Sequence, residues 1–119
     1  MSAITYTVDI TWSDVEAIER FVGERIHLQV EQYPAESPEG RTARALGALV
    51  SDSVLDASLA LEVDEPAITD DKLQLQHQLK EAWRRLVMAS RCWQTDRGYQ
   101  NDRWRTVTHT DATYERALR

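Results

Sequence analysis

Several residue types and patterns are scarce in this chain of 119 residues, and each scarcity excludes a class of protein. Cys92 is the only cysteine, so no disulfide can form within the chain. The four glycines lie far apart, so no glycine-rich loop of the Walker or dinucleotide-binding type can cradle a phosphate. No apolar run approaches the roughly 18 residues that a membrane span needs, and the start of the chain lacks the pattern of a signal peptide. We therefore expect a soluble, reduced, cytoplasmic protein.

Potential metal ligands are also sparse. The histidines and the cysteine nowhere lie three or four residues apart, so no helix offers a ready pair of metal ligands. The Glu16-x-x-Glu19 pair has the form of one acidic motif of helical nucleotide pyrophosphohydrolases, but the second motif is missing. One group of carboxylates supports a divalent-metal-dependent enzyme as a third functional hypothesis, although its spacing matches no EF-hand loop: Glu62, Asp64, Glu65, Asp70 and Asp71. We predict no metal, no cofactor and no catalytic residue, and favour a protein that is not an enzyme.

The charge of the chain is negative overall and unevenly distributed. The net charge is −6, and the length suits a single domain over residues 1–119. Residues 1–80 hold 15 acidic and 6 basic side chains, a net −9, whereas residues 81–119 hold 5 acidic side chains and 8 arginines, a net +3. Three arrangements fit this division: the arginine-rich part folds back on an acidic face of its own chain, pairs with a second copy, or binds an external polyanion.

Hydrophobic periodicity predicts the elements of the first third of the chain. Residues 4–12 alternate between apolar and polar side chains, which predicts a half-buried strand. A capping box at Ser13–Glu16 then opens a short helix that Gly23 would end. Two interpretations remain open beyond this glycine. Alternation over residues 25–33 predicts a second strand, whereas a continued helix is indicated by four apolar residues at helical spacing: Val22, Ile26, Val30 and Tyr33.

The remaining two thirds are predicted to be mainly helical. Residues 34–40 form a polar loop rich in proline and glycine. A helix begins at about Arg41, and a long helix spans residues 69–93. Residues 104–109 alternate and predict a third, short strand, and residues 110–118 predict a final helical turn. The helix that begins at about Arg41 is predicted to direct seven apolar residues toward the core: Ala43, Leu46, Leu49, Val50, Val54, Ala57 and Leu61.

These elements together predict an α+β fold. In it, a small two- or three-stranded sheet is covered by two long helices and one short helix. The alternative is a mostly α bundle with an N-terminal strand.

The long helix carries the strongest functional signal in the sequence. Six apolar residues recur along it at alternating steps of four and three, which is the seam of a helix that packs along its length against another: Leu75, Leu79, Ala82, Leu86, Ala89 and Trp93. Three of the four tryptophans lie in or just after this helix, interleaved with arginines. Aromatic and arginine side chains anchor many protein interfaces. Five residues are therefore candidate binding residues: Trp83, Arg84, Trp93, Trp104 and Arg105.

We accordingly predict a small non-catalytic protein that binds a protein partner or a second copy of itself through this helix. The alternative is a nucleic-acid-associated regulatory protein that binds through the C-terminal Arg/Trp segment, because arginines contact phosphates and exposed aromatic rings stack on unpaired bases. A structural explanation competes with both: the tryptophans belong to the core, and the arginines pair with the acidic half of the chain.

The composition and one short segment also bear on origin. Arginine outnumbers lysine 12 to 2, which is typical of GC-rich genomes. Residues 98–105 contain the pattern Tyr-x-x-x-x-Trp-Arg and resemble the ending of small actinobacterial and phage proteins. This resemblance implies a bacterial or phage protein and assigns no functional residue.

Overall fold

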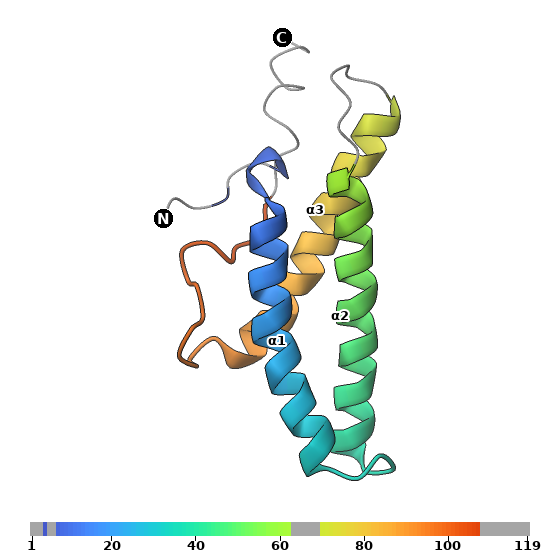
Figure 1. The fold of residues 1–119 in the computed structure, drawn as a ribbon, viewed down its shortest axis with the longest axis vertical. Coiled ribbons are helices and arrows are strands. Elements are labelled where there is room, and N and C mark those ends of the chain that lie inside the picture. The colour runs from blue at the N-terminus through green and yellow to red at the C-terminus, as the bar shows by residue number, and fades with distance from the viewer. Residues whose placement is uncertain (1–3, 5–6, 63–69, 108–119) are drawn as a thin grey trace.

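Three long helices form the framework of the computed structural model, which describes residue 4, residues 7–62 and residues 70–107. Figure 1 shows α1 and α2 as an antiparallel hairpin, with α3 crossing behind it and the segment after α3 running beside α1. Two short 3-10 turns, η1 and η2, flank this framework. The elements follow in this order: η1 (Thr7–Asp9), α1 (Trp12–Gln32), α2 (Pro38–Glu62), α3 (Asp70–Ser90) and η2 (Arg91–Trp93).

The α+β prediction is wrong, because the described part of the chain contains helices and turns but no strand. The alternative of a mostly α bundle is closer, yet its N-terminal strand is also missing from the described residues. Residues 104–107 are irregular where a third strand was expected, and residues 110–118 lie outside the described part. The alternation in residues 4–12 does not reflect a strand, since Thr7 is buried and Trp12 is 44% exposed, the reverse of what a strand would give at these two positions.

The start of α1 is fixed by a capping box two residues earlier than the predicted one at Ser13–Glu16. The Thr11 hydroxyl accepts a hydrogen bond from the Asp14 backbone N–H (3.3 Å), and the Asp14 carboxylate accepts one from the Thr11 backbone N–H (2.8 Å). These two bonds satisfy amide groups that have no partner within the helix. The chain therefore turns into a helix at Trp12 and leaves no room for a strand through this residue.

Helix α1 continues through Gly23, where the sequence predicted its end. Val15, Ile18, Val22 and Ile26 are almost fully buried at steps of three and four, whereas Leu28 is 62% exposed. A strand over residues 25–33 would have buried Leu28 on the same face as Ile26 and Val30. The continued-helix interpretation is therefore confirmed, because one unbroken apolar stripe packs against the other helices.

Helix α2 begins at Pro38, three residues before the predicted start. The hydroxyl of Ser37 accepts a hydrogen bond from the Gly40 backbone N–H (3.0 Å), as an N-capping serine does. Proline suits the first helical position because it has no N–H to satisfy and its φ angle is already helical. The serine–proline pair was therefore a helix signal rather than part of a loop.

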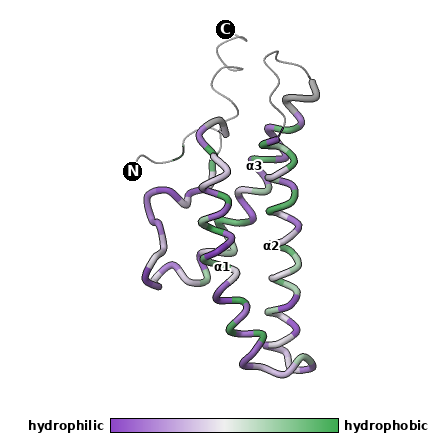
Figure 2. The backbone as a smooth tube through the Cα atoms, in the orientation of Figure 1, coloured by the Kyte–Doolittle hydropathy of each residue, from purple (hydrophilic) through white to green (hydrophobic). Residues whose placement is uncertain are grey.

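Helix α3 confirms the predicted long helix and its seam. Leu79, Ala82, Leu86 and Ala89 are buried, and the helix ends in η2 within three residues of the predicted end. The seam faces α2, where Ala43, Val50 and Ala57 repeat every seven residues and are buried. Figure 2 shows hydrophobic residues recurring along the helices, while the segment after η2 is mostly hydrophilic. Within the described residues, no helix combines the length and the apolar character that crossing a bilayer requires.

Two glycine substitutions test the continuous α1 and the tight α1–α2 turn. A Cβ at Gly23 would meet no atom within 4 Å, so Gly23→Ala should raise the free energy of unfolding by about 0.5–1 kcal/mol through helix propensity. A Cβ at Gly40 would collide with the backbone oxygen of Pro34, so Gly40→Ala should lower it by about 1–3 kcal/mol. Urea unfolding followed by circular dichroism measures both changes. A destabilising Gly23→Ala would contradict a helix that runs through this position.

Candidate functional site

The arginine-rich segment after η2, residues 94–107, is fastened along α1 and is called the strap below (Figure 1). Arg103 forms a bidentate ion pair with Asp14: Nε donates to Oδ1 and Nη2 donates to Oδ2, each at 2.7 Å. The same Nη2 also donates to the backbone oxygen of Asp9 at 2.6 Å. The two side chains are only 15% and 11% exposed, respectively. Charge-assisted bidentate pairs of this kind are among the stronger polar contacts in proteins.

A second arginine, Arg25 of α1, holds the other end of the strap. Its Nε donates to the Asp96 carboxylate (2.9 Å) and its Nη2 donates to the Arg97 backbone oxygen (3.2 Å). Its Nη1 donates to the backbone oxygen of Phe21 on the same helix (2.9 Å), and the guanidinium carbon lies 3.6 Å from the centroid of the Phe21 ring. Both hydrogen bonding and a cation–π contact therefore orient this side chain toward the strap.

An aromatic cluster lies between the two fastening points. The rings of Phe21, Tyr99 and Trp104 meet with centroids 5.0–5.8 Å apart in tilted and edge-on arrangements. Trp83 of α3 is fully buried, and its indole N–H donates to the Arg105 backbone oxygen at 2.8 Å. The strap thus closes the core on the side of α1 and α3 rather than forming a separate surface.

The five candidate binding residues occupy three different environments. Trp83 and Trp104 are 0% and 2% exposed, so they present no surface to a partner. Trp93 is half-buried and packs against the core. Arg84 and Arg105 are exposed; Arg84 lies 3.9 Å from Glu81 on its own helix, and Arg105 donates to the Asn101 backbone oxygen. Trp83 and Trp104 therefore belong to the core, as the structural explanation predicts, whereas the two arginines are exposed and Trp93 is partly so.

Within the described part of the chain, two arginines of residues 81–119 pair with the acidic part of the same chain. Besides Arg103 with Asp14, Arg85 on α3 contacts Asp56 on α2 at 2.9 Å. Its Nε also donates to the Ser53 hydroxyl at 3.0 Å. These contacts correspond to the fold-back arrangement inferred from the charge distribution.

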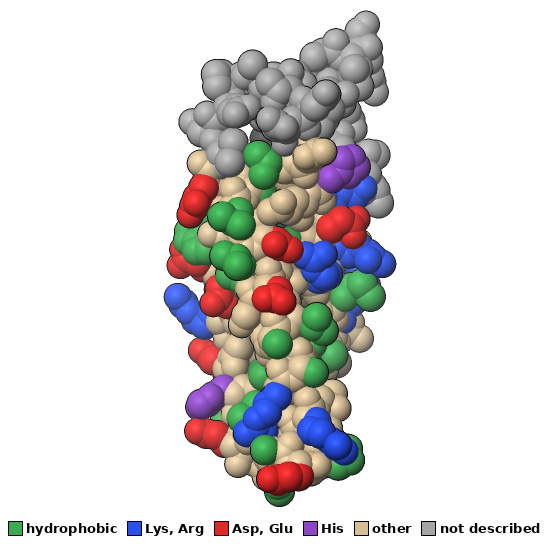
Figure 3. All heavy atoms as spheres, turned by 90° about the vertical axis from the view of Figure 1, so that its right-hand side faces the viewer, with side chains coloured by type: hydrophobic (Ala, Val, Ile, Leu, Met, Phe, Trp, Pro, Cys, Tyr) green, Lys and Arg blue, Asp and Glu red, His purple; other side chains and the backbone are tan. Residues whose placement is uncertain are grey.

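An apolar depression of the described surface lies between α2 and α3, where the sequence predicted no site. It encloses about 310 Å³ and is called the α2–α3 groove. Leu49 and Met88 stand on opposite sides of it and are 60% and 48% exposed. Figure 3, which looks onto α2, shows hydrophobic side chains reaching the surface on this side of the molecule. The groove is lined by Leu46, Leu49, Val50, Ser53, Arg85, Met88, Ala89 and Cys92.

Position on the helical repeat could have indicated the groove. Leu49 was predicted to point inward, but it lies one residue before the buried Val50 and therefore at the edge of the core stripe. Met88 lies one residue before the buried Ala89 and therefore at the edge of the seam of α3. Stricter use of the four–three spacing would have assigned both residues to the margins.

The lone cysteine of the chain lies at the groove. Cys92 is exposed at the end of the groove lining. The cysteine therefore provides a unique labelling position beside the apolar lining.

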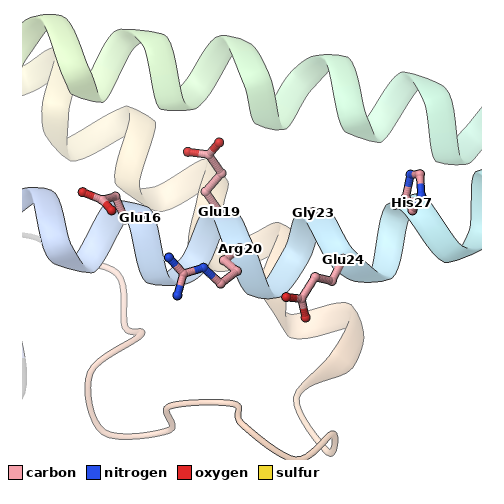
Figure 4. A pocket seen from close by; sticks show the side chains of 6 residues that line it. All are labelled: Glu16, Glu19, Arg20, Gly23, Glu24 and His27. Carbon is pink, nitrogen blue, oxygen red and sulfur yellow. The ribbon is translucent and has the colours of Figure 1, made fainter.

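A second depression lies along α1 and is lined mainly by residues with charged or titratable side chains. Figure 4 shows Glu16, Glu19, Arg20, Glu24 and His27 spaced along this single helix, with Glu19 and His27 directed toward α2 and Arg20 and Glu24 directed away from it. Among the described residues, no three His, Cys, Asp or Glu side chains come together as a metal site would require. The carboxylate group proposed for a divalent metal lies outside the described side chains except for Glu62.

Comparison with known proteins gives no relative from which a role could be transferred: no protein family, curated protein or solved structure matches this chain. The candidate site must therefore be judged on its own geometry. On that basis the α2–α3 groove is the strongest candidate, because apolar concave surfaces with a few polar groups are the usual form of binding sites.

The Asp14–Arg103 pair makes the stability of the fold depend on pH. Burial disfavours the charged carboxylate, but hydrogen bonds from Arg103 and Thr11 outweigh it and hold the pKa of Asp14 below its ordinary value. The stabilisation is therefore complete above the ordinary pKa of about 3.9 and is lost as pH falls through the lower folded-state pKa. Asp14→Asn should lower the free energy of unfolding at pH 7 by about 1–3 kcal/mol. Urea unfolding between pH 7 and pH 3 measures this.

The Asp96–Arg25 pair provides the matched control. Its aspartate is 44% exposed, so Asp96→Asn should cost less than about 1 kcal/mol. The Asp14→Asn variant should also lose the acid sensitivity that this carboxylate is expected to give the unmodified protein as pH falls below about 3.9. Identical acid sensitivity with and without this carboxylate would show that the pair does not stabilise the fold as described.

Proposed function

We propose that this protein is a small non-catalytic interaction protein that receives an apolar side chain of a protein partner in the α2–α3 groove. The observation that carries the proposal is the pair Leu49 and Met88, two large apolar side chains left about half exposed across one depression. Burying a side chain of this size is worth roughly 1.5–3 kcal/mol. A partner that covers both would therefore gain substantial free energy.

The chemistry of the groove favours a helical partner. Its walls are two helices, and its lining is apolar except for Ser53 and Arg85, which bond to each other across it. An amphipathic helix places apolar side chains at regular intervals into such a groove. Methionine adapts its shape to different partners because its side chain is flexible and polarizable.

The proposal moves the interaction surface away from the predicted Trp/Arg cluster. Trp83 and Trp104 act in the core, whereas Arg84 remains exposed on α3, the same helix as Met88. Nucleic-acid binding through the C-terminal segment loses two of its three candidate tryptophans for base stacking, because Trp83 and Trp104 are buried. We also propose a cytoplasmic location, which the exposed thiol of Cys92 supports because free thiols persist in reducing compartments.

Position-specific photo-cross-linking in the native host tests the proposal. A photoreactive amino acid replaces Leu49 at the groove or, as the control, Arg20, which is exposed on the outer side of α1. The groove position should form a discrete covalent adduct with protein, and the Arg20 position should not. Equal cross-linking from both positions, or adducts with nucleic acid alone, would overturn the proposal.

A charge placed in the groove should abolish that adduct. Met88→Lys introduces a cation that must be desolvated when a partner binds, so cross-linking from position 49 should fall at least about tenfold. Gln74→Lys is the matched control, because it adds the same charge at an exposed position of α3 outside the groove lining. The free energy of unfolding of each variant should lie within about 0.5 kcal/mol of that of the unmodified protein, since both positions are exposed. Equal losses in the two variants would contradict a role for the groove.

A further inference from the structure

Helix α2 carries a second stripe of residues on the side opposite its core stripe. Its members follow one another at alternating steps of four and three, the spacing of a helix that packs against another helix. All of them are exposed, although the chain offers no element to cover them within the described residues. The outer stripe of α2 consists of Arg41, Ala45, Ala48, Asp52, Leu55, Leu59 and Glu62.

The outer stripe is asymmetric along its length. It begins with a basic residue and two alanines and ends with two leucines and an acidic residue, with Asp52 in the middle. Leu55 and Leu59 are 57% and 48% exposed, and neither lines the α2–α3 groove. Figure 3 shows basic side chains near the lower end of this face, with acidic and hydrophobic side chains further up.

An antiparallel second copy of the stripe complements the first at every level except that of Asp52. With a two-fold axis beside Asp52, Arg41 of one copy lies opposite Glu62 of the other. Ala45 lies opposite Leu59, since each is seven residues from Asp52, and Ala48 lies opposite Leu55. Small side chains thus face large ones, which lets two helices approach closely while filling the space between them.

The charges favour the antiparallel arrangement over the parallel one. Parallel helices in register would bring Arg41 against its copy and Glu62 against its copy, where like charges repel. Within the described residues, neither side chain forms an ion pair. Opposite charges at flanking positions are the usual determinant of orientation in paired helices.

We propose that the protein forms a two-fold symmetric dimer in which the outer stripes of two α2 helices pack antiparallel. This inference goes beyond the proposed function, because it concerns a different face of α2 and a different partner. A two-fold interface uses the same patch on both molecules, so each complementary contact occurs twice. One helix pair buries less than a standard interface of about 1,600 Å², so the dimer is weak and dependent on concentration.

Asp52 limits the strength of this dimer. The two copies of its carboxylate meet at the axis, where like charges repel each other. Asp52→Asn removes the repulsion and keeps the size of the side chain, so it should tighten dimerisation by about three- to tenfold.

Charge exchange at the ends of the stripe tests the geometry. Sedimentation equilibrium from about 1 µM to about 1 mM gives the dissociation constant of each variant. Arg41→Glu and Glu62→Arg should each weaken the dimer about tenfold, because each turns two attractive contacts into two repulsive ones. The double variant should return to within about threefold of the unmodified protein, because it restores opposite charges at both ends. Weakening in the single variants without recovery in the double variant would overturn the antiparallel pairing.

Disulfide trapping tests the position of the axis in a Cys92→Ser background. Asp52→Cys places a thiol next to its own copy, so oxidation should trap a covalent dimer. Arg41→Cys is the control: at a rise of 1.5 Å per residue its two copies lie about 30 Å apart along the helix pair and should stay reduced. Equal trapping at both positions would overturn the proposed axis.

Two further variants separate this proposal from the groove proposal. Leu55→Glu should raise the dissociation constant of the dimer at least about tenfold and leave cross-linking from the groove unchanged. Met88→Lys should leave the dimer unchanged. A monomer at all concentrations, with groove cross-linking retained, would overturn the dimer and leave the proposed function intact. Circular dichroism of each variant verifies that the helices remain folded.

Discussion

The bidentate contact between Asp14 and Arg103 is the constraint on which the arrangement of this protein depends. The same carboxylate caps α1 through Thr11 and holds the strap through Arg103, so one side chain joins the beginning of the fold to its last described segment. The surrounding protein excludes most water from the pair, so its hydrogen bonds contribute more to the stability of the fold than those of an exposed ion pair.

Closure of the core follows from this contact. A strap held along α1 brings Trp104 onto Phe21 and places the Arg105 backbone oxygen where the Trp83 indole needs an acceptor. Three helices alone would leave this aromatic surface facing water. The strap therefore takes the place of a fourth helix on the side of α1 and α3, although it forms few regular backbone hydrogen bonds.

The opposite side of the molecule has no such cover in the described part of the chain. Leu49, Leu55 and Leu59 of α2 and Met88 of α3 are all about half exposed or more. Contiguous apolar groups of this kind on a small domain commonly mark interaction sites. The two proposed surfaces differ in chemistry: the groove is apolar and concave, whereas the outer stripe combines leucines and alanines with opposite charges at its ends.

The sequence by itself determined the long third helix, its buried seam and the acidic–basic division, because regular spacing and net charge do not depend on distant contacts. It left open the choice between strand and helix after Gly23, since Ile26 and Val30 fit both periods, and packing against α2 decided it. It predicted strands at residues 4–12, where a cap at Thr11 turned the chain into a helix instead. The candidate site was missed for a related reason. Tryptophans and arginines mark interfaces and cores alike, and only the tertiary structure showed that the strap buries Trp83 and Trp104 while Leu49 and Met88 remain in contact with water.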